Sequence, residues 1–103
     1  MSLPYDLRPE PFARISSAGG VAVRPLLIGD RADWTRLWHG YLVFYETAAS
    51  EAQYDLNWAR LFDPAEPVFG FLAEREGKAV GLVHIVFHRS FWLEGPSCYL
   101  QDL

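Results

Sequence analysis

Apolar and polar positions change their spacing several times along the chain, and each change predicts a different element. Residues 21–26, "VAVRPL", alternate in the manner of a strand, and Pro25 places this strand at a sheet edge or near its own end. From Asp30 onward, apolar residues recur at intervals of three and four. This spacing predicts a helix that begins at Asp30 and has one apolar face, formed by Trp34, Leu37, Trp38, Tyr41, Leu42 and Tyr45.

Further along, the spacing predicts a second helix and a pair of strands. Ser50 and Gln53 have the form of a capping box, in which each residue accepts a hydrogen bond from the backbone of the other. The helix that they begin is stopped by Asp63, which precedes a proline. Two apolar runs, 68–75 and 79–88, are joined by a short polar turn and therefore predict a β-hairpin.

The two ends of the chain differ in character. Residues 1–20 contain Pro and Gly residues that resist regular structure, and they predict an N-terminal arm. The turn "EGP" at 94–96 leads into a last run, "CYLQDL" at 98–103, which has the spacing of a strand. The expected order is arm, strand, two helices and three strands, in a chain of 103 residues that is long enough for one domain only.

Composition and charge narrow the class of protein. Hydrophobic residues make up 50% and aromatic residues 16% of the chain, which excludes a disordered chain and provides rings for a ligand cleft or an interface. The net charge of -4 is scattered without a basic stripe, which argues against nucleic acid as a partner and suits small cationic substrates. We expect a soluble, cytoplasmic protein with no membrane partner, because no apolar run reaches roughly 18 residues and no signal peptide is recognisable.

Few residues are candidates for chemistry. His84 and His88 are expected on one face of a strand, but four strand residues span about 13 Å, too far for one metal ion to bridge both rings. No metal site is predicted, and each ring is expected to face a wet cleft or to be a satisfied core histidine. Cys98 is expected to be a small buried residue, with a catalytic thiol as the alternative. The sequence has neither a G-x-S-x-G elbow nor a Gly-rich phosphate loop.

Four stretches, taken in order, match the pattern of one enzyme family. They are 23–34 ("VRPLLIGDRADW"), 41–46 ("YLVFYE"), 77–92 ("GKAVGLVHIVFHRSFW") and 98–103 ("CYLQDL"). The set resembles the N-terminal half of the GNAT superfamily of N-acetyltransferases. The stretches correspond to the first strand with its capped helix, the aromatic and acidic end of that helix, the hairpin with a glycine such as Gly81, and the fourth strand. The last stretch is similar to the branch that includes the diamine acetyltransferases.

This resemblance implies both a fold and an activity. The fold would be α+β, an antiparallel four-stranded sheet with two helices inserted between its first and second strands. Residues 21–103 would be the N-terminal portion of a GNAT-like domain that transfers an acetyl group from acetyl-CoA to a primary amine by direct attack. The pyrophosphate-binding loop of the family would follow shortly after Leu103, so the acetyl-CoA-binding half is expected to be absent.

The same resemblance assigns roles to individual residues. The backbone of Gln101, Asp102 and Leu103 would hold the acetyl carbonyl. Related diamine enzymes have a Glu-Asp pair where this chain has Gln101-Asp102, and Gln cannot accept a proton, so the role of base passes to Asp102 or to an ordered water. The amine pocket would be lined by Tyr45, Glu46, His88 and Trp92.

Each assignment has a structural alternative. Asp102 could pair with an Arg or a backbone N–H, Glu46 could be a solvated helix end, and Trp92 could pack in the core, as the other three tryptophans are expected to do. The rival to an enzyme is a non-catalytic binding or dimerisation module that kept the sheet and pocket. An apolar sheet face without a helix and an open edge at the last strand predict a homo-oligomer.

Overall fold

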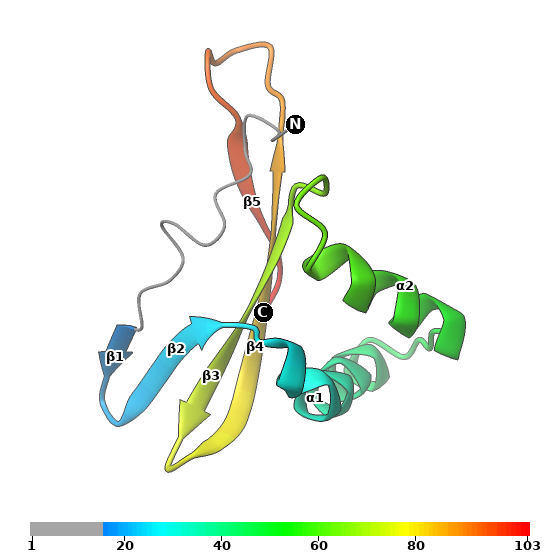
Figure 1. Cartoon of the computed structure of the whole chain (residues 1–103), viewed down its shortest axis with the longest axis vertical. Helices are drawn as coiled ribbons and strands as arrows, with labels where there is room; N and C mark the ends of the chain where they lie inside the picture. The colour runs from blue at the N-terminus through cyan, green and yellow to red at the C-terminus, as the bar shows by residue number, and fades with distance from the viewer. Residues whose placement is uncertain (1–15) are drawn as a thin grey trace.

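A twisted antiparallel sheet with two helices on one side forms the fold (Figure 1). The computed structural model describes residues 16–103. Its elements are β1 (Ser16–Ala18), β2 (Val21–Pro25), the short 3-10 helix η1 (Ile28–Asp30), α1 (Arg31–Phe44), α2 (Glu51–Leu61), β3 (Val68–Arg75), β4 (Lys78–His88) and β5 (Ser97–Asp102). The strands follow one another across the sheet in their order along the chain. In this described part, no helix is both long and apolar enough to span a membrane.

The predicted α+β fold is confirmed. Strands β2 to β5 are the expected four antiparallel strands, and both helices lie between β2 and β3 in the chain. The sequence pattern did not predict β1, because its residues were assigned to the arm. Gly19 and Gly20 have φ angles of 60° and 79°, the backbone that a two-residue hairpin turn requires and that glycine adopts without steric cost. The rest of the predicted arm, 1–15, lies outside the described residues.

Both helices begin where the sequence predicts, but they are capped in different ways. At α2 the Ser50 side chain accepts a hydrogen bond from the Gln53 N–H at 3.2 Å, and the Gln53 side chain accepts one from the Ser50 N–H at 3.1 Å. The predicted capping box is thus confirmed. Asp30 occupies the N-cap position of α1, yet its side chain makes no cap hydrogen bond to that helix. Its carboxylate accepts instead from Arg24 and from the backbone N–H of Leu27.

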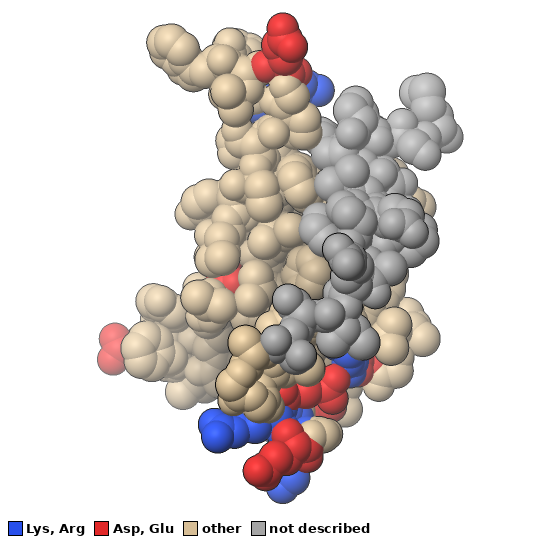
Figure 2. Space-filling view, turned by 90° about the vertical axis from the view of Figure 1, so that its left-hand side faces the viewer, with Lys and Arg blue, Asp and Glu red and all other residues tan. Residues whose placement is uncertain are grey.

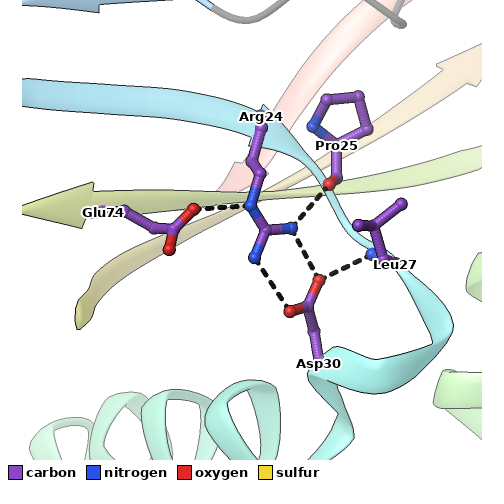
Figure 3. A network of polar contacts seen from close by, with 5 residues as sticks. All are labelled: Arg24, Pro25, Leu27, Asp30 and Glu74. Carbon is purple, nitrogen blue, oxygen red and sulfur yellow. Dashed lines mark hydrogen bonds and ion pairs between the residues drawn. The ribbon is translucent and has the colours of Figure 1, made fainter. Parts of the chain in front are cut away.

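Arg24 links the sheet to the start of α1 (Figure 3). Its guanidinium donates to both oxygens of Asp30, at 2.7 and 2.9 Å, and to Glu74 on β3 at 2.5 Å. The pKa of Asp30 is lowered, chiefly because Arg24 donates hydrogen bonds to the carboxylate, and burial opposes this shift. Since Asp30 is only 9% exposed, the network fixes the turn that leads from β2 through η1 into α1.

Aromatic and leucine side chains fill the space between the helices and the sheet. Trp34 and Leu72 are fully buried, and the rings of Trp34 and Trp58 lie with their centroids 5.1 Å apart. The prediction that the tryptophans of the helices pack in the core is confirmed for these two, whereas Trp38 is only partly buried. The core is completed by Leu26, Leu61, Ala79 and Leu82. This packing sets the position of the inner face of α1 over the central strands.

The last strand, β5, pairs with β4 only, in the part of the chain that the structure describes. Tyr99 and Leu100 are about half exposed, and Cys98 is exposed as well. The expectation of a buried cysteine was wrong, because α1 packs mainly on β4 and α2 on β3, and neither helix covers this edge strand as they do the central ones. Figure 2 shows the side of the molecule that lies to the left in Figure 1: among the residues drawn in colour, charged groups gather mainly near the two ends of this side.

Candidate functional site

A pocket of about 330 Å³ opens between the two helices and the strands β3, β4 and β5. Its apolar lining includes Trp38 of α1, Leu61 of α2 and Val86 of β4. Its polar lining consists of Asn57, Arg60, Glu66, His84, Gln101 and Asp102. A concave site with an apolar wall and a few converging polar groups is the arrangement that small-molecule sites usually have.

A β-bulge turns Asp102 toward this pocket. In the ladder between β4 and β5, Ile85 lies opposite Leu100 but His84 lies opposite Asp102, so Gln101 is the extra residue. One extra residue reverses the alternation of side chains along a strand, and Asp102 therefore points to the helix-covered side. Asp102 is 8% exposed, whereas Gln101 is exposed.

His84 holds the carboxylate of Asp102 from the neighbouring strand. Its Nδ1 lies 3.0 Å from Oδ2 of Asp102, and its Nε2 accepts a hydrogen bond from the indole N–H of Trp34 at 2.9 Å. The imidazole also packs against the ring of Trp38 at a steep angle, with centroids 4.9 Å apart. The pKa of His84 is lowered, because burial disfavours the charged ring more strongly than the nearby Asp102 favours it. The contact with Asp102 is accordingly a hydrogen bond from a neutral ring rather than an ion pair.

Tyr41 of α1 approaches the same carboxylate. The pKa of Tyr41 is raised to about 12, first because its hydroxyl is hydrogen bonded to Asp102, and further by burial and by the negative charge of Asp102. The Tyr41 ring stacks on Trp38 at a centroid distance of 5.0 Å and lies 4.8 Å from the ring of Tyr45. A row of three aromatic rings thus runs along α1 beside the carboxylate, and such rings can stabilise a cation by contact with their faces.

The structure brings together some of the predicted site residues and leaves others apart. Gln101 and Asp102 both line the pocket, and Tyr45 is connected to it through Tyr41. Glu46 is exposed beyond the end of α1, with a φ of 56° that is uncommon for a residue other than glycine. Leu103, the third predicted contact of the acetyl group, is 77% exposed. The roles of all these residues remain predictions.

The other two predicted pocket residues lie toward the loop between β4 and β5. Trp92 is 95% exposed, so it does not pack in the core, which was the alternative to a binding role. His88 is exposed at the end of β4, where its Nδ1 lies 3.1 Å from the carbonyl of Arg89. Neither side chain lines the pocket that contains Asp102.

Sequence reasoning did not identify the two residues that meet Asp102, which are Tyr41 and His84, or the link from Trp34 to Asp102 through His84. Trp34 and Tyr41 were placed on the inner face of the helix, and His84 was expected to be a core or cleft histidine, but none was connected to Asp102. The connection depends on the bulge at Gln101, which brings Asp102 opposite His84. No signal in the sequence marks this bulge, because Gln101 is an ordinary strand residue rather than a glycine.

One cation and one further carboxylate line the pocket besides Asp102. Arg60 of α2 and Glu66, in the loop before β3, form a long ion pair with 3.9 Å between the charged atoms. The Arg60 side chain is 47% exposed, so water screens this pair and the guanidinium can exchange partners. Within residues 16–103 no group of three or more His, Cys, Asp and Glu side chains is arranged to hold a metal ion.

Comparison with known proteins gives a similarity to an acetyltransferase. No family model matches the chain. The chain is 28% identical over 85 residues to a D-amino-acid N-acetyltransferase, HPA3, of Saccharomyces cerevisiae. The matched region covers 81% of this chain and 53% of that protein, so the chain spans about half the length of the curated relative. The similarity supports an acetyltransferase, in agreement with the resemblance seen in the sequence, but it does not support the diamine acetyltransferase branch.

Proposed function

We propose that this chain carries the amine-binding part of an N-acetyltransferase, which transfers an acetyl group from acetyl-CoA to a primary amine of a small molecule by direct attack. The observation that carries the proposal is the inward-pointing carboxylate of Asp102, which lines a pocket beside a row of aromatic rings. A buried carboxylate next to such rings attracts a protonated amine. The similarity to an N-acetyltransferase supports the same reaction class.

Asp102 would act on the proton of the amine. A primary amine arrives mostly as an ammonium ion, which cannot attack a carbonyl until it loses a proton. The carboxylate of Asp102, directly or through an ordered water, would accept that proton. When acetyl-CoA is bound, it supplies a thioester carbonyl carbon to which the neutral nitrogen can bond, and the departing sulfur takes up a proton. No residue of the chain needs to form a covalent intermediate.

The residues present fit only one end of acetyl-CoA. The bulge leaves Gln101 without an opposite residue on β4, so its backbone can contact a ligand instead of the ladder. For the pyrophosphate, the 103 residues contain no Gly-rich loop that opens a helix. We therefore assign the binding of the amine and of the acetyl group to this chain, and assign no residue of the chain to the binding of the phosphates.

An amino acid is the substrate class that the pocket suits best. The lining includes one guanidinium, that of Arg60, and the carboxylate of Asp102. An amino acid could therefore present its carboxylate to Arg60 and its amine to Asp102, because a guanidinium matches a carboxylate with two parallel hydrogen bonds. The yeast relative is named for D-amino acids, which also carry a carboxylate and an amine. A diamine, which the resemblance to the diamine branch suggests, would place its second ammonium against Arg60 and be repelled.

Activity of the complete reading frame tests the proposal. Release of CoA from acetyl-CoA is measured with amino acids, diamines and monoamines, for the wild type and for carboxylate-to-amide variants. Asp102→Asn should lower kcat by about 100-fold or more, the usual loss when a general base is removed. Glu46→Gln should mainly raise KM, because an exposed carboxylate beyond the end of α1 can attract charge but handles no proton. Unchanged turnover of Asp102→Asn across the pH range would remove the assignment of the base.

Asp55→Asn is the matched control for these variants. Asp55 lies on α2 with a side chain that is 69% exposed, it does not line the pocket, and the same change of carboxylate to amide should leave kcat and KM unchanged. If no amine is acetylated by the complete product, the second candidate applies: a binding or dimerisation module. The observation that favours this second candidate is the absence of a phosphate-binding loop in the 103 residues.

A further inference from the structure

The indole N–H of Trp34 is hydrogen bonded to the imidazole of His84. Trp34 is 0% exposed, and a side chain without a polar atom could fill the same buried space. Its Nε1 donates to Nε2 of His84 at 2.9 Å, and the other nitrogen of that ring faces Asp102 at 3.0 Å. A buried donor is therefore connected through one imidazole to the carboxylate of the pocket.

This connection determines where the proton of His84 lies. An indole N–H can only donate, so Nε2 of His84 must be the acceptor and cannot carry a proton. The neutral ring then carries its proton on Nδ1, which donates to Oδ2 of Asp102. Protonation of the ring would place an N–H on Nε2 directly against the N–H of Trp34, and one of the two donors would lose its partner in a buried place.

Asp102 consequently receives hydrogen bonds from neutral groups. The hydroxyl of Tyr41 and the Nδ1–H of His84 are its side-chain partners, and among residues 16–103 no Lys or Arg forms a salt bridge with it. A cationic partner would cancel the charge of the carboxylate and repel an ammonium ion. Neutral donors hold the carboxylate in place and leave its negative charge available to a substrate.

We propose that Trp34 and His84 form a fixed, neutral pair whose function is to position the carboxylate of Asp102, and that His84 is a positioning residue rather than an acid or base. The positioning role rests on the proposed function, in which Asp102 accepts the proton of the amine. The arrangement of the pair itself does not depend on that function. The titratable and charged groups around the ring are Asp102 on β5, Tyr41 on α1, and Arg60 and Glu66 in the lining of the same pocket.

Nuclear magnetic resonance of the 103-residue chain tests the pair without any activity. A long-range ¹H–¹⁵N spectrum distinguishes the two tautomers of each imidazole, and the exposed His39 and His88 serve as internal comparisons. We expect His84 to be the neutral Nδ1–H form at about pH 6, where a free imidazole is mostly protonated. In Trp34→Phe, which keeps a ring but removes the donor, the ring of His84 should become protonated at higher pH than in the wild type. An Nε2–H tautomer in the wild type, or a fully protonated ring at that pH, would overturn the proposal.

Two substitutions of His84 separate positioning from proton transfer in the complete reading frame. The amide nitrogen of Asn can occupy the place of Nδ1, so His84→Asn keeps a donor for Asp102 that does not titrate. His84→Leu removes the donor and should lower kcat on the order of 10- to 100-fold, with a smaller effect on KM. His84→Asn should recover most of this loss and keep the shape of the pH profile. Loss of one limb of the pH profile in His84→Asn would show that His84 itself transfers a proton.

The two experiments separate the two proposals. If the tautomer is Nδ1–H but no amine is acetylated, the proposed function fails while the Trp34–His84 pair stands as a structural feature. If amines are acetylated and His84→Leu turns over as fast as the wild type, the function stands and the positioning role is refuted. Should Trp34→Phe not fold, the wild-type spectrum and the two His84 variants still decide the question.

Discussion

Replacing Asp30 by Asn removes one charge from the network that ties α1 to the sheet. The two side chains of the ion pair, Arg24 and Asp30, are 19% and 12% exposed, and their atoms lie as close as 2.7 Å. Removal of one partner from a buried ion pair costs about 3–5 kcal/mol. We expect a smaller loss here, about 2 kcal/mol, because Asn still accepts a hydrogen bond and because Glu74 still faces Arg24.

The same chemical change at an exposed pair provides the comparison. Arg31 and Asp55 lie 2.8 Å apart, but their side chains are 37% and 69% exposed. Asp55→Asn should therefore cost about 0.5 kcal/mol or less. Urea unfolding followed by tryptophan fluorescence measures both variants, because Trp34 and Trp58 are buried in the fold. A loss of 2 kcal/mol would move the midpoint by about 1 M urea.

The pH dependence of stability provides a second test, because the pKa of Asp30 fixes the direction in which stability changes in acid. The folded-state pKa of Asp30 is lowered, so its charge stabilises the fold fully above the unfolded pKa of about 3.9, and this contribution falls as pH drops toward the folded pKa. The advantage of the wild type over Asp30→Asn should therefore be constant from pH 7 to about pH 4.5 and shrink toward pH 3. Two results would refute the importance of the network. One is an equal loss of unfolding free energy for Asp30→Asn and Asp55→Asn at pH 7. The other is a stability difference between the wild type and Asp30→Asn that does not shrink in acid.

Three further predictions concern binding. Calorimetry of the 103-residue chain should show that acetyl-CoA binds with a Kd above about 1 μM, that is, with a binding free energy smaller than about 8 kcal/mol, because the chain has no phosphate loop. A micromolar Kd would mean that the phosphate site has been misplaced. Light scattering across a dilution series should show self-association through the open edge of β5, where Tyr99 and Leu100 are about half exposed, and a stable monomer at low micromolar concentration would contradict it. In the complete reading frame, Arg60→Gln should raise KM for amino acids by about tenfold relative to monoamines of the same size, and an equal change for both classes would remove Arg60 from carboxylate recognition.

Local patterns in the sequence determined the elements of the fold. The Ser50 and Gln53 capping box, helix α1 and the β3–β4 hairpin all depend on residues that are close in the chain, and each was predicted correctly. The predicted apolar face of α1 included Tyr45, which follows the end of the helix and is 61% exposed. Their energies come from contacts within one helical turn or across one hairpin, so neighbouring residues suffice to specify them. The resemblance to N-acetyltransferases likewise came from the order of such segments, and the similarity to a yeast enzyme supports it.

Only the tertiary structure decided which of these residues meet. Asp30 had the right place for a helix cap, but Arg24 offered its carboxylate a charged partner, and a charge-assisted pair is stronger than a cap. Trp34 and His84 are separated by 50 positions, and their hydrogen bond exists only because α1 packs over β4. The candidate site depends most of all on one extra residue, Gln101, since a bulge reverses which side of a strand each later residue faces. That reversal is governed by pairing and packing across the sheet, so the alternation of residues 98–103 alone could not show that Asp102 points inward.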